Sequence, residues 1–189
     1  KIFLIGCKVC GSAIREAYLI LGERPYEREE VNYEEPGPKR DKLLALNPLG
    51  QVPTLVLPSG QILTETLAIA HWVHSFRPDI GLIPSDASDL PKFLRWSTFL
   101  ISSIYPTFTY GDFPNRWVSD EKGAALLKQS TDDKRKELFK FLEKECQGPF
   151  FLGEKWCAID LYFAAMVYWR PRRQWFEAEC PRLFASANL

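Results

Sequence analysis

Residues 47–73 read NPLGQVPTLVLPSGQILTETLAIAHWV, and the first half of the chain is organised around them. A short apolar run, Thr54–Leu57, is followed by a Pro-Ser-Gly turn and a returning run, Gln61–Leu63. The pair Glu65-Thr66 then precedes apolar residues at helical spacing. The stretch therefore predicts a loop, a β-hairpin and a covering helix.

Pro53 marks the edge of this hairpin, because proline cannot donate a hydrogen bond to a ladder and belongs at a strand start or edge. A cis bond before Pro53 would turn the amide and carbonyl of Val52 outward, where an extended peptide can pair with them. Beside that edge, the helix N-terminus at Thr66 favours a carboxylate, and Glu65 favours an ammonium. Together these features suit a small peptide ligand with a free amino-acid end.

Composition narrows the class of protein. The 189 residues include 24 lysines and arginines and 24 aspartates and glutamates, so we expect neither nucleic acid nor an acidic membrane surface as a partner. The apolar runs are too short to span a bilayer, and the first residues lack the length of a signal-peptide core. Five cysteines, without the spacing of a disulfide framework, indicate a reducing compartment. We therefore expect a soluble, cytoplasmic protein.

Hydrophobic periodicity predicts an α/β unit followed by an all-helical one. Before the opening stretch we expect a strand, a helix, a strand and a short helix, at residues 1–5, 12–21, 26–31 and 43–46. A Pro- and Gly-rich linker follows. The remainder is expected to form a helix ending at Tyr105-Pro106, a connector over 107–116, a helix from an N-cap at Ser119 to about Glu145, and a buried helix over 160–169.

The stretch at 47–73 resembles the glutathione-binding segment of cytosolic glutathione transferases. That family has Asn-Pro, then Val-Pro, a hairpin, and Glu-Ser before a helix rich in alanine and isoleucine. The resemblance covers nearly the whole chain, and it implies a thioredoxin-like βαβαββα domain at 1–77, a linker at 78–90 and an all-helical domain at 91–189. Cys157-Ala-Ile-Asp160 is similar to the family's helix-capping box, with Cys157 in place of serine or threonine, a change that weakens the cap by about 1 kcal/mol.

The resemblance also implies a ligand, glutathione, as co-substrate. Val52 backbone groups should pair with its cysteinyl unit, while Glu65 and Thr66 should hold its γ-glutamyl end. Thr66 replaces the family's usual serine and keeps the hydroxyl. Gln51 or Lys42 is expected to reach a terminal carboxylate. The implied glutathione-binding residues are Lys42, Gln51, Val52, Pro53, Glu65 and Thr66.

The catalytic position should lie between the first strand and the first helix, where a donor and a helix N-terminus lower the pKa of the glutathione thiol. Family members use tyrosine, serine or cysteine there, and no tyrosine is present. The candidates are Cys10, Ser12 and Cys7. Cys10 occupies the position of the bacterial cysteine-type members, which are the most similar in this turn, and a helix N-terminus should lower its pKa. The alternative for Cys10 is a small apolar plug.

Cysteine chemistry leaves further alternatives open. Cys10 could form a mixed disulfide with glutathione, which gives thiol transfer or reduction instead of conjugation. Cys7-Lys-Val-Cys10 also has the spacing of a redox dithiol. A zinc site is disfavoured because no second cysteine pair or nearby histidine accompanies it. His71 and His74 lack a third ligand and are interpreted as surface or interface residues, so we expect no metal.

In the second half, five aromatic residues could line an apolar co-substrate pocket or could pack between helices. They are Tyr105, Phe108, Tyr110, Phe113 and Trp117. Arg170, Arg172 and Arg173 are interpreted as a solvated helix end, with a weaker alternative role in gripping an acidic substrate.

The resemblance implies a detoxifying glutathione S-transferase that conjugates glutathione to an apolar electrophile. It also implies a homodimer, formed through the helices at 65–77 and 90–105. Two alternatives remain: a cysteine-dependent glutathione thiol transferase or reductase, and a non-catalytic glutathione-binding or regulatory module.

Overall fold

The computed structural model describes residues 1–6 and 12–188, with Ser12 described in its backbone only. The chain divides into two compact units, Lys1–Ile83 and Pro84–Leu189. The predicted linker at 78–90 spans this point of division and stays a prediction.

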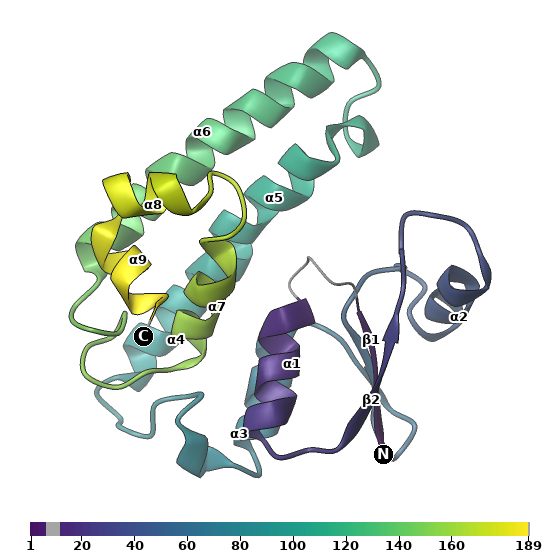
Figure 1. The fold of residues 1–189 in the computed structure, drawn as a ribbon, viewed down its shortest axis with the longest axis horizontal. Helices are drawn as coiled ribbons and strands as arrows, with labels where there is room; N and C mark the ends of the chain where they lie inside the picture. The colour runs from purple at the N-terminus through teal and green to yellow at the C-terminus, as the bar shows by residue number, and fades with distance from the viewer. Residues whose placement is uncertain (7–11, 189) are drawn as a thin grey trace. The chain divides into compact units, whose positions relative to one another are not determined.

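The first unit has the element order βαβαββα, as predicted, and is a thioredoxin-like domain (Figure 1). Its elements are β1 (Ile2–Gly6), α1 (Ser12–Leu21), β2 (Tyr26–Glu30), α2 (Pro38–Leu46), β3 (Thr54–Val56), β4 (Ile62–Leu63), α3 (Thr66–His74) and the 3₁₀ turn η1 (Pro78–Ile80). The strands form one 4-stranded sheet in the order β2-β1-β3-β4. β1 runs parallel to β2 and antiparallel to β3, and β4 pairs antiparallel with β3.

Helices cover both faces of this sheet, with α2 on one side and α1 and α3 on the other (Figure 1). On the α2 side, Ile5 of β1 packs in a buried cluster with Val31 and Leu43. Successive strand residues point to opposite faces, so Leu4 serves the α1 and α3 side. There a Cβ at residue 22 would meet Val73 Cγ1 at 2.8 Å, so glycine at this position allows α1 and α3 to approach closely.

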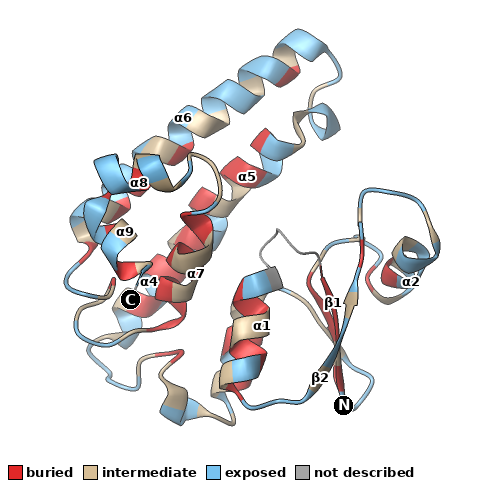
Figure 2. Ribbon diagram, viewed as in Figure 1, coloured by how far each residue is buried: buried red, intermediate tan, exposed pale blue. Residues whose placement is uncertain are grey.

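The second unit is all helical, which confirms the predicted fold class. Its elements are α4 (Leu90–Phe99), the π-helical segment η2 (Leu100–Ile104), α5 (Tyr105–Asp112), the 3₁₀ turn η3 (Pro114–Arg116), α6 (Glu121–Glu145), α7 (Ala158–Met166), α8 (Arg173–Glu179) and α9 (Pro181–Ser186). α7 is largely buried, as its apolar composition predicts, whereas one side of the long α6 is exposed (Figure 2). α5 packs on α6, and α7 packs on α4 and α9.

The expected end of a helix at Tyr105-Pro106 is wrong. The helix continues as α5 to Asp112, and the expected connector is reduced to a few residues around η3. Two features explain this. Pro106 is the second residue of α5, where its missing N–H costs little. The π-helical segment η2 directly before α5 shifts the hydrogen-bond pattern by one residue, which accommodates the proline ring.

The caps of α6 and α7 refine two further predictions. α6 is capped by Asp120 rather than Ser119: Asp120 Oδ1 accepts a hydrogen bond from the backbone N–H of Gly123 at 2.7 Å. α7 begins at the predicted box, where Asp160 Oδ2 accepts from the Cys157 N–H at 2.9 Å. The buried Asp160 also accepts from the Phe151 N–H at 2.7 Å and from the Ser186 hydroxyl at 2.8 Å. This carboxylate therefore joins α7 to α9 and to the turn before α7.

Candidate functional site

The loop that carries Val52 is held by two buried polar side chains. Asn47 Nδ2 donates to the Gln51 carbonyl at 3.0 Å and to Thr54 Oγ1 at 3.2 Å. Thr54 Oγ1 in turn donates to the Gln51 carbonyl at 3.0 Å. Asn47 is 8% exposed and Thr54 0%, so water competes little with these bonds. The sequence interpretation missed both roles, although the Asn-Pro motif was a signal for the first.

The bond between Val52 and Pro53 is cis, the isomer that the sequence interpretation considered. β3 begins at Thr54, which pairs with Ile5 in the antiparallel register. Each step backwards along β3 corresponds to a step forwards along β1, so Val52 lies beyond the ladder, past Gly6 at the end of β1. Val52 is therefore placed at the end of the sheet from which the predicted catalytic turn departs.

The predicted γ-glutamyl residues lie at the start of α3. Thr66 is the first residue of this helix and Glu65 precedes it at the N-cap. Glu65 is exposed and has a φ of 65°, a conformation that non-glycine residues seldom adopt. The Glu65 side chain does not cap the helix, so the amides of the first turn point outward unblocked by it. This end of α3 can accept an anion.

A buried arginine joins this end of α3 to the start of α1. Arg15 is 1% exposed, and its Nε donates to Thr66 Oγ1 at 2.9 Å. Because Arg15 lies in the first turn of α1, the N-terminal ends of the two helices are neighbours. Sequence reasoning missed Arg15. The available signal was a charged residue beside Ile14 on the buried face of a helix.

Of the three catalytic candidates, Ser12 is the first residue of α1. Cys7 and Cys10 lie outside the described residues, and Ser12 is described only as the first backbone position of α1. Their roles stay predictions. Two boundaries do frame the segment that carries them, because Gly6 ends β1 and Ser12 begins α1.

Two predicted ligand residues have other contacts in the structure. The Lys42 ammonium pairs with Glu29 and lies 4.3 Å from the centroid of the Phe3 ring, on the α2 side of the sheet. The Gln51 side chain is exposed, while its carbonyl accepts the two bonds within the loop. The contact of Lys42 with a ligand carboxylate stays a prediction.

The five aromatic residues predicted for a co-substrate pocket fall into separate groups. Tyr105 and Phe108 pack edge-on with Trp169, at centroid distances of 5.8 and 5.2 Å. Tyr110 and Trp117 form a pair of their own at 4.7 Å. The Arg116 guanidinium instead lies over the Phe113 ring, 4.2 Å from the ring centroid. The sequence interpretation did not include Trp169 among these aromatic residues.

Hydrogen bonds and ion pairs hold α5, the helix of Tyr105 and Phe108, against α6. Buried Arg135 of α6 donates to Thr107 Oγ1 at 2.9 Å and to the Thr107 carbonyl at 2.6 Å, and it pairs with Asp132 at 2.6 Å. Arg170 pairs with the same Asp132 at 3.2 Å and with Asp112 at the end of α5. Arg170 is therefore engaged in an ion-pair network that ties α5 to α6.

The histidine pair is placed on α3. His71 Nδ1 lies 2.9 Å from the Leu67 carbonyl, and His74 is half-buried. Burial and the neighbouring His71 lower the pKa of His74. No group of three or more potential metal ligands occurs among the residues with described positions.

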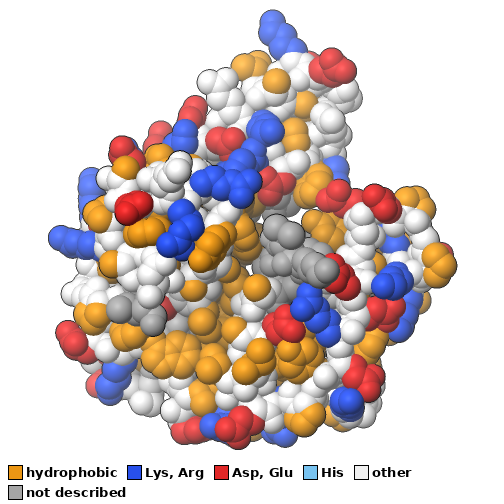
Figure 3. All heavy atoms as spheres, in the orientation of Figure 1, with side chains coloured by type: hydrophobic (Ala, Val, Ile, Leu, Met, Phe, Trp, Pro, Cys, Tyr) orange, Lys and Arg blue, Asp and Glu red, His pale blue; other side chains and the backbone are white. Residues whose placement is uncertain are grey.

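Figure 3 shows basic and acidic side chains side by side on much of one face, in keeping with the 24 of each in the sequence.

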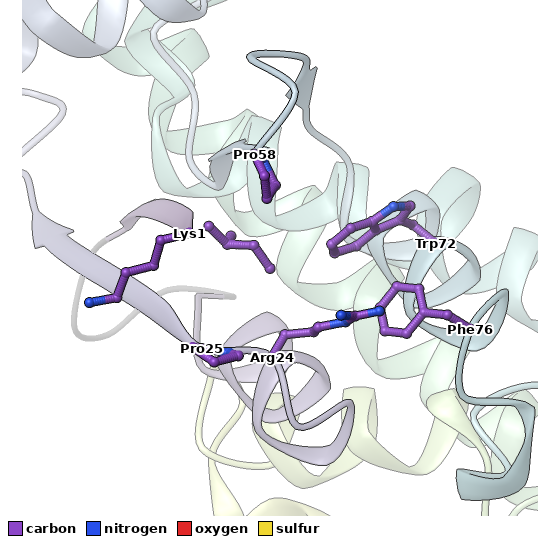
Figure 4. Close-up of a pocket in the computed structure, with 7 residues that line it drawn as sticks. Lys1, Arg24, Pro25, Pro58, Trp72 and Phe76 are labelled. Atoms are coloured by element: carbon purple, nitrogen blue, oxygen red, sulfur yellow. The ribbon is translucent and has the colours of Figure 1, made fainter.

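A cavity of about 560 Å³ lies elsewhere in the first unit (Figure 4). It is lined by Lys1, Ile2, Arg24, Pro25, Pro58, Trp72 and Phe76. Lys1 and Ile2 are at the start of β1, and β1 ends at Gly6, so this cavity and the predicted glutathione site lie at opposite ends of the strand. None of the predicted glutathione-binding residues lines it.

Within the described ranges, no helix has the length and apolar character needed to cross a bilayer.

Comparison with known proteins agrees with the geometry of the first unit. Residues 16–75 match the family described as glutathione S-transferase, N-terminal domain. The Escherichia coli (strain K12) uncharacterized GST-like protein YncG is 36% identical over 180 residues, which cover 94% of this chain and 86% of that protein.

Two solved structures share the fold over almost the whole chain. A glutathione transferase homologue from Sulfitobacter, with bound glutathione, has a TM-score of 0.83 and 21% identity, over 99% of this chain and 90% of its own. A glutathione S-transferase from Methylobacillus flagellatus, with glutathione bound, has a TM-score of 0.81 and 18% identity, over 100% of this chain and 93% of its own. With a matching family domain and a relative that is 36% identical over most of both chains, the chain belongs to the glutathione S-transferase family.

Proposed function

We propose that this protein is a glutathione transferase that joins the glutathione thiolate to an apolar electrophile. The hydrogen bond from Arg15 Nε to Thr66 Oγ1, at 2.9 Å, is the observation that carries the proposal. It makes neighbours of the N-terminal ends of α1 and α3. The segment that holds the catalytic candidates leads into the first helix, and the predicted γ-glutamyl residues begin the second.

Glutathione is the co-substrate in this proposal. Its cysteinyl unit pairs with the backbone of Val52, before the cis bond to Pro53. Its γ-glutamyl carboxylate lies at the N-terminus of α3 beside Thr66, and its ammonium faces Glu65. Gln51 or Lys42 contacts a terminal carboxylate. The two solved relatives with bound glutathione support this choice of ligand.

The reaction is a nucleophilic displacement. The thiol proton passes to solvent, the sulfur lone pair forms a bond to the electrophilic carbon, and the leaving group departs with its bonding electrons. Cys10, Ser12 and Cys7 are the candidates for the group that stabilises the thiolate, with help from the N-terminus of α1. Tyr105, Phe108, Tyr110, Phe113 and Trp117 supply the apolar surface for the electrophile, and we add Trp169 to this set because it packs on two of them.

We further propose a cytoplasmic homodimer with a role in detoxification. Leu90 and Leu94 are 38% and 47% exposed and lie one turn apart on α4. Two large apolar side chains on one exposed helix face suit a contact with a second copy. Light scattering coupled to size-exclusion chromatography measures the mass in solution, and a monomeric mass would refute this part of the proposal.

Enzyme assays separate the proposal from its alternatives. The wild-type protein is expected to conjugate glutathione to chlorodinitrobenzene. The Cys10→Ser variant tests the mechanism: retained conjugation with loss of activity toward hydroxyethyl disulfide favours a thiol transferase or reductase. Retention of both activities excludes Cys10 as the catalytic group and leaves Ser12 and Cys7, which Ser12→Ala and Cys7→Ser then test.

A third outcome concerns binding without turnover. If glutathione binds and neither substrate reacts, the protein is a non-catalytic glutathione-binding module. If calorimetry detects no glutathione binding, the proposed function fails.

A further inference from the structure

Arg15 is a charged residue that is almost completely buried in the first unit. Its neighbours Ile14, Tyr18 and Leu19 on α1 are also buried, and Arg15 itself is 1% exposed. Burial of a guanidinium costs several kcal/mol of solvation, whereas an apolar side chain of similar length would fill the space without that cost. Filling space does not by itself explain an arginine here.

The direction of its hydrogen bond with Thr66 determines what the threonine can do. A guanidinium only donates, so Thr66 Oγ1 accepts from Arg15 Nε, at 2.9 Å. The hydroxyl hydrogen of Thr66 takes no part in this bond. A hydroxyl that accepts from a cation is polarised and becomes a stronger donor.

The surroundings of Thr66 suit one kind of acceptor. Thr66 begins α3, and the Glu65 side chain does not cap this helix. The first-turn amides, the positive end of the helix dipole and the charge of Arg15 all favour a negative group at this point. A carboxylate there accepts from the Thr66 hydroxyl and from the amides together.

We propose that Arg15 is a positioning residue for the α-carboxylate of the γ-glutamyl unit. It acts through Thr66, whose hydroxyl hydrogen it turns toward that carboxylate, and it adds a buried positive charge behind it. Arg15 has no contact with the peptide in this scheme. The inference rests on the proposed function, since it takes glutathione as the ligand.

Two peptides isolate this effect in calorimetric titrations. One is glutathione, and the other is γ-aminobutyryl-cysteinylglycine, which is glutathione without the α-carboxylate. The proteins are the wild type, Arg15→Met, Thr66→Val and the double variant. Thr66→Ser, which keeps the hydroxyl, is the matched control. Thermal unfolding of each variant reports on its fold.

Arg15→Met is expected to weaken glutathione binding by at least about tenfold, the size of a charge-assisted hydrogen bond. Binding of γ-aminobutyryl-cysteinylglycine should change by no more than about twofold, because the affected group is missing from that peptide. In the Thr66→Val background the same arginine substitution should add little, since the hydroxyl through which it acts is gone. Thr66→Ser keeps the donor hydroxyl, so it should retain the preference for glutathione over γ-aminobutyryl-cysteinylglycine that Thr66→Val loses.

Three results would overturn the role of Arg15. Equal weakening of both peptides by Arg15→Met indicates general disruption, unchanged binding of both indicates that Arg15 is dispensable, and full additivity in the double variant indicates that it does not act through Thr66. If Arg15→Met does not fold, Arg15→Gln is titrated instead and is expected to lose affinity for glutathione selectively, because it lacks the charge. Failure of the proposed function is a distinct outcome, in which the wild type binds neither peptide.

Discussion

Asn47 Nδ2 lies 3.2 Å from Thr54 Oγ1, and both groups also bond to the Gln51 carbonyl, each at 3.0 Å. This triangle closes the loop directly before the β3 ladder. The carbonyl that it holds belongs to Gln51, the residue directly before Val52, so the triangle fixes the chain at the point where Val52 begins.

Asn47→Ala is therefore expected to affect both stability and binding. Loss of its buried hydrogen bonds should lower the free energy of unfolding by about 1–3 kcal/mol, measured in urea. Glutathione affinity should fall by at least about tenfold because the backbone of Val52 is no longer held. Asn115→Ala is a control at an exposed position in η3 and should alter neither quantity. Unchanged affinity in Asn47→Ala would show that the loop does not bind glutathione.

Glu65 is predicted to pair with the γ-glutamyl ammonium. Glu65→Gln removes the charge at an exposed position and should weaken glutathione binding by about tenfold. Glutaryl-cysteinylglycine, which lacks the ammonium, should bind the variant and the wild type equally. Glu35→Gln, in the exposed loop before α2, is the control. If the variant loses affinity for both peptides to the same degree, Glu65 acts on the structure of the site instead of on the ammonium.

Buried thiols should stay unreactive in the native protein. Cys146, Cys157 and Cys180 are buried, and burial raises the pKa of each thiol, in Cys180 to about 12. At about pH 8 these thiols stay protonated and react slowly with iodoacetamide. Peptide mapping after brief alkylation should find them modified only when urea is present. Native modification of Cys157 as fast as in urea would contradict the buried position of this residue.

The same shift predicts how stability depends on pH. The folded pKa of Cys180, about 12, exceeds its ordinary value of 9.0, so the unfolded chain releases this proton first as pH rises. The stability contribution is complete below the ordinary value and is lost progressively as pH rises from there toward the folded pKa. Cys180→Ala should therefore lose stability less steeply than the wild type above about pH 9. If the free energies of unfolding of the wild type and of Cys180→Ala, measured in urea, fall equally steeply with pH, the raised pKa of Cys180 is refuted.

The cap of α7 offers a gain in stability. Cys157 is at the N-cap position, and its sulfur is a weak acceptor for the backbone N–H of Asp160. Cys157→Ser supplies a hydroxyl oxygen and should raise the free energy of unfolding by about 0.5–1 kcal/mol. Cys157→Ala, which has no acceptor, is the comparison and should be less stable than Cys157→Ser. A serine variant no more stable than the alanine variant would show that the cap is satisfied without this side chain.

Local patterns predicted the elements of this protein better than its long-range contacts. The alternation and turn chemistry at 47–73 correctly placed β3, β4 and the start of α3 at Thr66. The helix end predicted at Tyr105-Pro106 was wrong because the π-helical segment before it accommodates the proline. That segment has no clear local signature in the sequence.

In the candidate site, too, local motifs were predictable from the sequence and long-range contacts were not. Glu65 and Thr66 follow from a family-like motif and a helix start. The partner of Thr66 is 51 positions away, in another helix, so its hydrogen bond to Arg15 depends on how α1 and α3 pack. Asn47 likewise acts through Thr54 on the following strand. A charged or amide side chain on an otherwise apolar, buried surface is the signal that points to such roles.

A crystal structure of the protein soaked with glutathione would show whether the peptide binds at Val52 and Thr66. We expect the γ-glutamyl carboxylate to lie within hydrogen-bond distance of Thr66 Oγ1. We also expect the cysteinyl backbone to pair with Val52 and the sulfur to face the segment between Gly6 and Ser12. Glutathione bound with its γ-glutamyl end away from Thr66, or bound in the cavity beside Trp72 and Phe76, would contradict the proposed binding site.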